Sequence, residues 1–88
     1  MKVWVYTERD DDQPNMTIEV YDTHAAACDR LRQNVERYFE KPFDEIEEIP
    51  YTGPQDESLY INADSVEYWT ASYGTIRWDV DEREVLSA

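Results

Sequence analysis

The chain has 88 residues, a formal net charge of −13, 41% hydrophobic residues and 14% aromatic residues. This hydrophobic content is too high for a disordered acidic tail, and the length predicts one domain, 1–88, and excludes a second. The negative charge argues against direct binding to DNA, RNA or an anionic membrane, because each of these would repel it.

Targeting signals and cysteine use indicate the compartment. No apolar run reaches the length of a signal peptide, or the roughly 18 residues that a membrane span needs. The one cysteine, Cys28, excludes an intrachain disulfide and fits a reducing compartment. We therefore expect a soluble cytoplasmic protein, in the cytoplasm of the host cell if the gene is carried by a phage.

The N-terminal part of the chain has the pattern of a β-hairpin. Along Lys2–Thr7 two valines alternate with two aromatic residues, and along Met16–Tyr21 aliphatic side chains alternate with polar or aromatic ones. This two-residue period is typical of strands. Between these segments, Glu8–Asn15 contains three consecutive aspartates and Pro14, a composition that interrupts strands and suits an exposed loop. The pattern predicts two strands joined by this loop.

The period changes to that of a helix after Thr23. Either Asp22 or Thr23 can cap the first turn, and Pro42 marks the end of the segment. An apolar stripe with spacings of three and four residues predicts the buried face: Cys28, Leu31, Val35, Tyr38 and Phe39. The rest of the helix surface mixes acids with arginines and is nearly neutral.

The second half of the chain has mainly the patterns of strands. Pro42–Pro50 is open to two interpretations, a helical turn or an irregular edge segment between prolines. Thr52–Glu57 has the composition of a loop, and Ser58–Asn62 and Ser65–Ser72 predict strands. The whole pattern predicts a small α+β domain, with one amphipathic helix packed on an antiparallel sheet in approximate order β-β-α-β-β-β.

The last strand follows a turn at Tyr73–Gly74. If this pair forms a two-residue loop, Trp69 lies opposite Trp78, and both tryptophans occupy one sheet face as part of the core. The other face is then expected to carry a polar and aromatic mixture that suits solvent or a partner: Val66, Tyr68, Thr70, Arg77, Asp79 and Asp81.

Acidic residues are distributed unevenly along the chain. Residues 1–23 have a net charge of −4, residues 24–41 of +1, and residues 42–88 of −10. This concentration favours a cationic partner, since a charge that serves only solubility or salt adaptation predicts a more even spread.

Residues for catalysis and metal binding are few. The chain has one histidine, His24, and one cysteine, and neither lies in a nucleophile motif, so we expect no catalytic pair, no enzyme activity and no cofactor. These residues are also too few for a four-ligand zinc site from one chain. Asp10–Asp12 offers oxygen ligands but lacks the spacing of an EF-hand loop, which favours a solvated turn and no metal.

The acidic clusters are the candidate partner-binding site. Residues two apart on a strand project from one face at roughly 6.6 Å, so Asp79 and Asp81 space two charges on the scale of a nucleic-acid backbone. Five tyrosines would act as anchors unless they belong to the core: Tyr6, Tyr51, Tyr60, Tyr68 and Tyr73. The candidate partner-binding residues are Asp10, Asp11, Asp12, Asp44, Glu45, Glu47, Glu48, Asp56, Glu57, Tyr68, Asp79, Asp81, Glu82 and Glu84.

In size and charge the chain resembles the small acidic inhibitors of bacteriophages and mobile elements, including anti-CRISPR and anti-restriction proteins, and acidic immunity proteins and antitoxins. The resemblance implies a non-enzymatic inhibitor that binds a basic protein, a nuclease or another nucleic-acid-binding effector, as a DNA or RNA mimic. The alternative is a small interaction or structural domain that self-associates as a homodimer through a sheet edge, and whose acidity serves only solubility.

Overall fold

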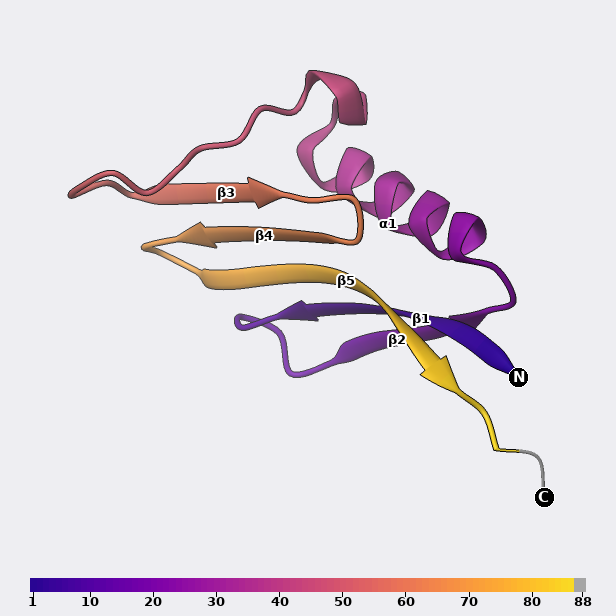
Figure 1. Cartoon of the computed structure of the whole chain (residues 1–88). Helices are drawn as coiled ribbons and strands as arrows, with labels where there is room; N and C mark the ends of the chain where they lie inside the picture. Colours follow the sequence, from indigo (N-terminus) through magenta and orange to yellow (C-terminus); the bar gives the residue numbers. More distant parts are fainter. Residues whose placement is uncertain (87–88) are drawn as a thin grey trace.

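A five-stranded antiparallel sheet carries one helix on one of its faces in the computed structural model, which describes residues 1–86 (Figure 1). The strands follow the spatial order β2-β1-β5-β4-β3, which places the C-terminal strand at the centre. The elements are β1 (Lys2–Asp10), β2 (Met16–Tyr21), α1 (His24–Phe39), η1 (Phe43–Glu45), β3 (Glu57–Ile61), β4 (Ser65–Thr70) and β5 (Gly74–Glu84). This arrangement confirms the α+β fold and the order β-β-α-β-β-β.

β1 and β2 form the predicted hairpin, but β1 continues beyond its predicted end to Asp10. The extension follows from the second neighbour of β1, since β5 pairs with it along its whole length. Asp11 closes this pairing: its N–H donates to the Thr75 carbonyl at 3.0 Å, and its carboxylate accepts from the Thr75 N–H at 3.2 Å. The local alternation pattern contains no information about a strand partner so distant in sequence.

α1 begins and ends where the sequence predicts. Thr23 is the N-cap, and its Oγ1 accepts from the Ala26 N–H at 3.1 Å. At the C-terminal end, Glu40 adopts a left-handed conformation with φ 57°, and Pro42 follows shortly after. No helix within residues 1–86 is long and apolar enough to cross a membrane.

The core lies between α1 and the sheet face that the helix covers. From the helix, Ala27, Leu31 and Val35 are fully buried, whereas Tyr38 of the predicted stripe is 48% exposed. The sheet contributes Tyr6, Leu59, Val66, Ile76, Trp78 and Val80. Burial of these side chains is the main favourable contribution to the stability of so small a domain.

The segment between α1 and β3 covers one edge of the sheet. η1 is a single helical turn, after which the chain becomes extended and Ile49 forms an antiparallel bridge with Leu59 of β3. Both interpretations of residues 42–50 therefore hold, each for a part of the segment. At the opposite edge, β2 has no further strand beside it in the described part of the chain.

The β4–β5 hairpin differs from the prediction in its turn. Residues 71–73 join the strands, so the turn has three residues and not the predicted pair Tyr73–Gly74. Gly74 has φ 80°, a left-handed conformation that glycine adopts without strain. Trp69 consequently lies opposite Thr75 and not opposite Trp78.

This change of register overturns two predictions, because an odd shift moves side chains to the other face of a sheet. Trp69 and Trp78 do not share a face: Trp78 is buried against α1, and Trp69 lies on the face away from it. Tyr68 does not accompany Asp79 and Asp81 either, since Tyr68 packs beneath α1 and the two aspartates lie on the other face.

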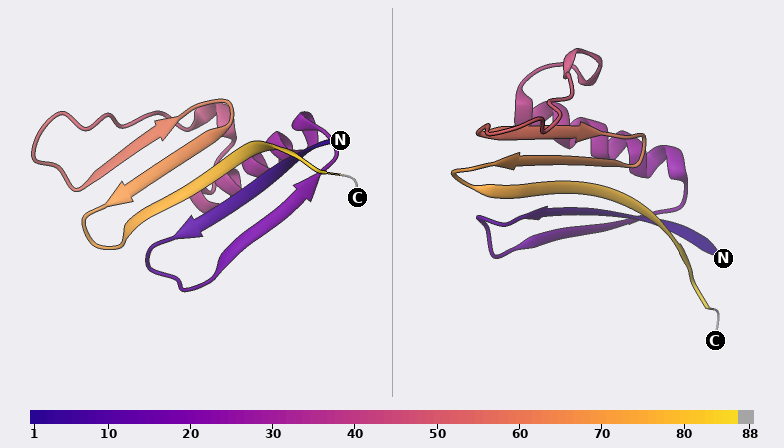
Figure 2. Two further views of the ribbon diagram at one scale, coloured as in Figure 1. Left: turned by 60° about the horizontal axis from the view of Figure 1, so that its bottom comes forward. Right: turned by 60° about the vertical axis from the view of Figure 1, so that its left-hand side comes forward.

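The face of the sheet away from α1, which we call the open face, is not covered by any element of residues 1–86 (Figure 2). Three apolar side chains of β2 are exposed there: Met16, Ile18 and Val20. Val5 of β1 lies opposite Val20 and extends this apolar group. The open face is thus apolar along β2 and charged along β5.

Candidate partner-binding site

The acids of β5 are largely neutralised by neighbouring basic groups. Three of them form ion pairs, Asp81 with Arg83 (3.6 Å), Glu82 with Lys2 (2.9 Å) and Glu84 with the N-terminal ammonium (3.2 Å). Asp79 and Asp81 share the open face, as their spacing predicts, whereas the alternate positions Glu82 and Glu84 point to the other side. These pairs reduce the charge that β5 presents to a partner.

Asp79 belongs to a mixed charge network at the centre of the open face. Burial raises the pKa of its carboxyl, the Arg77 guanidinium acts against this, and the Asp81 and Glu67 carboxylates add to the rise in pKa. Glu67 itself lies 3.2 Å from Arg77 across the β4–β5 pair. This part of the open face therefore contains charges of both signs and does not form a purely anionic row.

The aspartate triplet shapes the β1–β2 turn. Asp10 Oδ1 accepts from the Asp12 N–H at 2.9 Å, and Asp11 is bound to the start of β5 as described above. The triplet lies at the end of the sheet where the chain enters β3 near Asp56 and Glu57. Two strands, β5 and β4, separate the two groups of acids at that end.

The largest group of acids lies in the segment that runs from the end of α1 to the start of β3. We call this group the acidic rim; its members are Glu40, Asp44, Glu45, Glu47, Glu48, Asp56 and Glu57. Lys41 is the one basic residue in this range. No acid of the rim forms an ion pair with a basic group of residues 1–86, in contrast to the acids of β5.

Two hydrogen bonds attach the acidic rim to the sheet. Glu48 Oε2 accepts from the Ile61 N–H at 3.0 Å, and Glu57 Oε2 accepts from the Tyr68 hydroxyl at 2.6 Å. The second bond, together with burial, raises the pKa of Tyr68 to about 12, because loss of the proton would place a phenolate beside a carboxylate. The rim is thus held against β3 and β4 and is not a detached acidic loop.

A cavity of about 530 Å³ lies between the acidic rim and the sheet. Its apolar lining comes from both layers of the fold: Phe39, Ile46, Ile49, Leu59 and Tyr68. Its charged lining consists of four rim acids and one base: Glu45, Glu47, Glu48, Glu57 and Lys41. An apolar lining with carboxylates around it suits the chemistry of an arginine or lysine side chain, whose stem is apolar and whose tip is cationic.

Exposed aromatic side chains adjoin the acidic rim. Tyr51 and Tyr60 are 56% and 43% exposed, and the Tyr51 N–H donates to the Tyr60 hydroxyl oxygen at 3.0 Å. The Tyr51 ring packs edge-on against Trp69, with ring centroids 6.1 Å apart. These three residues form an aromatic group at the β3 side of the sheet.

The structure divides the tyrosines proposed as anchors. Tyr6 is fully buried and Tyr68 packs against Phe39 with centroids 5.1 Å apart, so neither presents its ring to a partner as predicted. Tyr51, Tyr60 and Tyr73 are exposed. Sequence alone does not separate the two groups, because the same residue type serves on both faces of a strand.

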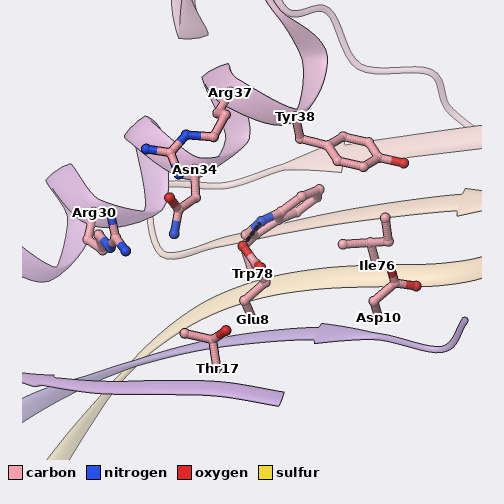
Figure 3. Close-up of a pocket in the computed structure, with 9 residues that line it drawn as sticks. All are labelled: Glu8, Asp10, Thr17, Arg30, Asn34, Arg37, Tyr38, Ile76 and Trp78. Carbon is pink, nitrogen blue, oxygen red and sulfur yellow. Dashed lines mark hydrogen bonds between the residues drawn. The ribbon is translucent and has the colours of Figure 1, made fainter. Parts of the chain in front are cut away.

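A groove of about 410 Å³ lies between α1 and the β1–β5 part of the sheet (Figure 3). Arg30, Asn34, Arg37 and Tyr38 line its helix side, and Glu8, Asp10, Thr17, Ile76 and Trp78 line its sheet side. Glu8 and Asn34 are engaged in hydrogen bonds: Glu8 Oε1 accepts from the Tyr6 hydroxyl (2.9 Å) and from Trp78 Nε1 (2.8 Å), and Asn34 Nδ2 donates to the Tyr6 oxygen (2.8 Å).

The groove network fits a structural role. Burial raises the pKa of the Tyr6 hydroxyl far above its ordinary value, so the phenol stays neutral and does not act as a base. Arg30 is already held by Glu19, at 2.8 Å between Nε and Oε1. The groove therefore joins helix and sheet through satisfied hydrogen bonds.

One group of chemically reactive side chains was not predicted. His24 and Cys28 lie four residues apart on α1, and Asp64 reaches them from the turn between β3 and β4. Burial raises the pKa of the Cys28 thiol, and the hydrogen bond to Asp64 raises it further, which disfavours a free nucleophilic thiolate. The helical spacing of His24 and Cys28 is readable from sequence, but the approach of Asp64 is not.

Comparisons with known proteins supply no family for this chain. No family model, no curated protein and no solved structure matches it.

Proposed function

We propose that this protein is a non-enzymatic acidic inhibitor that binds a basic protein, a nuclease or another nucleic-acid-binding effector, in the cytoplasm. The observation that supports this proposal best is the acidic rim, where seven carboxylates stand against Lys41 and have no ion-pair partner within residues 1–86. The inhibitor competes with nucleic acid for the partner and does not itself bind DNA or RNA.

Unpaired carboxylates favour association with a cationic surface in two ways. Their field attracts a basic partner over distance and accelerates encounter at low salt. A rim acid also gains a new ion pair on binding, whereas Asp81 or Glu82 of β5 would first have to leave an internal partner. The rim therefore takes the principal role, and the β5 acids of the predicted site contribute less.

The cavity behind the rim supplies a place for one basic side chain of the partner. Its apolar lining, including Ile46 and Leu59, accommodates the methylene stem, and the carboxylates of Glu45 and Glu47 are available to the charged tip. Tyr51 and Tyr60 are exposed at the same edge of the sheet, and Tyr60 points to the face opposite to Leu59, so they would serve as aromatic anchors for a partner that extends around this edge. Charge would determine the encounter, and these contacts would determine how long the complex lasts.

A capture experiment with nucleic-acid competition tests the proposal. The tagged protein is incubated at low salt with lysate of cells that encode it, and of their host cells if the gene is viral, and is then eluted with duplex DNA or RNA. We expect one nucleic-acid-binding protein to be released by the competitor and by rising salt. If nothing bound is displaced by either nucleic acid, the inhibitor proposal is wrong.

A pair of matched variants connects capture to the acidic rim. Glu45→Gln with Glu47→Gln removes two exposed rim charges, and Asp22→Asn with Asp29→Asn removes two exposed charges outside it. We expect the first double variant to lose most of the captured protein and the second to retain it. If the two double variants captured equal amounts of the protein, the acidic rim would not be the binding site, and net charge alone would explain the binding.

The second candidate function is self-association through the free edge at β2. It is favoured by the exposed apolar side chains Met16, Ile18 and Val20 on a strand with an unpaired edge among the described residues. Sedimentation at increasing concentration tests it: a dimer that dissociates in Ile18→Lys supports self-association, and a monomer at all concentrations excludes it.

A further inference from the structure

We propose that His24, Cys28 and Asp64 form a binding site for a divalent transition-metal ion, with Zn²⁺ as the ion that their atoms fit best. The site combines one nitrogen, one sulfur and one oxygen ligand from two elements that are remote in sequence. The sequence led us to expect no metal, since histidine and cysteine are too few for a four-ligand zinc site from one chain; this inference departs from that expectation because it takes its third ligand from a carboxylate and leaves the fourth position open.

The three ligand atoms already form a triangle of suitable size. His24 Nε2 lies 2.8 Å from Asp64 Oδ1 and 3.4 Å from Cys28 Sγ, and Cys28 Sγ lies 3.6 Å from the same Asp64 oxygen. Around tetrahedral Zn²⁺, the usual bond lengths place sulfur about 3.5 Å from nitrogen or oxygen, and nitrogen about 3.3 Å from oxygen. To reach these values on metal binding, only the distance between His24 Nε2 and Asp64 Oδ1 has to increase, by roughly half an ångström.

The ligand types select the class of ion. A thiolate and an imidazole suit zinc and other late transition metals, whereas calcium and magnesium prefer sites made of oxygen atoms alone. On binding, the Cys28 sulfur forms a bond to the metal and its proton leaves to solvent, while His24 binds as the neutral imidazole. The two negative charges of Cys28 and Asp64 then balance the ion.

The backbone holds the ligands in position. His24 and Cys28 project from one face of α1, whose first turn is fixed by the Thr23 cap. Asp64 belongs to a tight turn that is itself tied to β5, since the Val80 N–H donates to the Asp64 carbonyl at 2.8 Å. A bound ion would therefore link the start of α1 to the β3–β4 turn.

The fourth coordination position faces solvent. The side chains of His24 and Asp64 are 52% and 54% exposed, so the site is open on one side. Three protein ligands with an open position leave room for a water molecule or for an atom of a bound partner. The positive end of the α1 dipole opposes a cation near His24, and the two anionic ligands offset this effect.

Metal titration of the reduced protein, residues 1–88, tests the site. The probes are Zn²⁺, measured by competition with a chromophoric chelator, and Co²⁺, whose bond to a thiolate gives a near-ultraviolet charge-transfer band. Excess Mg²⁺ is present throughout, because it occupies sites made only of carboxylates. We expect one Zn²⁺ per chain, and a Co²⁺ complex with the thiolate band that Zn²⁺ displaces.

Variants identify the ligands. A residue that only hydrogen-bonds to a metal ligand contributes about 10- to 100-fold to metal affinity, and loss of a ligand itself should cost more. We therefore expect Cys28→Ala or His24→Ala to weaken Zn²⁺ binding by at least about 100-fold. Asp64→Asn should weaken it by about tenfold or more, and Asp29→Asn, which removes a neighbouring exposed charge, should leave it unchanged.

Two results would overturn the metal site. One is a Co²⁺ complex of the unmodified protein without a thiolate band, which needs no variant and so does not depend on folding of a mutant. The other is Zn²⁺ affinity that is equal in Cys28→Ala and in the unmodified protein. Neither result bears on the acidic rim, whose capture experiment is independent of this site.

Discussion

Glu8 joins two core aromatic side chains through one oxygen atom. The Tyr6 hydroxyl and the Trp78 indole N–H both donate to its Oε1, at 2.9 and 2.8 Å. Trp78 is 1% exposed and Tyr6 is fully buried, so the carboxylate is the acceptor that satisfies both donors. At the scale of single residues, this acid stabilises the fold and is not part of the anionic surface.

We expect Glu8→Ala to lower the free energy of unfolding by about 2 to 4 kcal/mol, because it leaves two buried donors without an acceptor. Glu47→Ala, at an exposed position of the acidic rim, should change it by less than about 0.5 kcal/mol. Urea denaturation of both variants measures the difference. Equal stability of the two variants would show that the groove network contributes nothing.

The bond between Glu57 and Tyr68 predicts an effect on titration. The carboxylate is the main reason why the pKa of Tyr68 is about 12 instead of the ordinary 10.0. Because the folded state has the higher pKa, the stabilising contribution of Tyr68 is complete below about pH 10 and is lost as pH rises toward 12.

Glu57→Gln should therefore lower the pKa of Tyr68 toward 10, as measured by the absorbance of tyrosinate. Tyr68→Phe identifies which titration step belongs to this residue. Glu47→Gln, which removes a rim charge without a hydrogen bond to Tyr68, serves as the control. A titration curve that is identical in Glu57→Gln and in the unmodified protein would contradict the role of this bond.

At the scale of elements, the β4–β5 turn determines which side chains face α1. Gly74 ends this turn with φ 80°, and a Cβ added there would lie 3.1 Å from the Asp11 side chain. Gly53, in the loop before β3, has no atom within 4 Å of such a Cβ. An alanine substitution at Gly74 therefore tests the turn, and the same substitution at Gly53 is its control.

We expect Gly74→Ala to destabilise the protein by about 1 to 2 kcal/mol, since a left-handed conformation is unfavourable for residues with a Cβ. Gly53→Ala should change the free energy of unfolding by less than about 0.5 kcal/mol. Thermal or urea denaturation compares the two. Similar losses in both variants would contradict the register assigned to this hairpin.

The sequence predicts the elements of this fold better than their pairing. Alternation located β1 and β2, and the spacing of Leu31 and Val35 with the Thr23 cap located α1, because these signals are local. Register is not local: a turn of two or of three residues fits the same sequence around Gly74, and the difference changes the face of Trp69.

The candidate site was predictable to a similar extent. Uneven charge indicated that residues 42–88 hold most of the acids, and every member of the acidic rim except Glu40 lies in this part of the chain. Which acids are neutralised depends on contacts such as that of Glu82 with Lys2, between the two ends of the chain. The approach of Asp64 to His24 likewise depends on the tertiary fold.

At the scale of the whole molecule, the fold separates structural acids from unpaired ones. Acids on the strands mostly bind basic groups, hydroxyls or N–H groups, whereas most of the acidic rim faces solvent beside β3. Figure 1 shows this segment passing along one side of the sheet, remote from β2 at the other edge. The acidic rim and the apolar edge strand β2 thus lie at opposite edges of the sheet.

The rate at which the captured partner associates with this protein tests the central claim most directly. It is measured over a series of salt concentrations for the unmodified chain, for Glu45→Gln with Glu47→Gln, and for Asp22→Asn with Asp29→Asn. We expect the rim variant to associate about 3- to 10-fold more slowly at low salt and to show a weaker salt dependence, while the control matches the unmodified chain. Equal rates for the two double variants at low salt would contradict the claim that the acidic rim receives the partner.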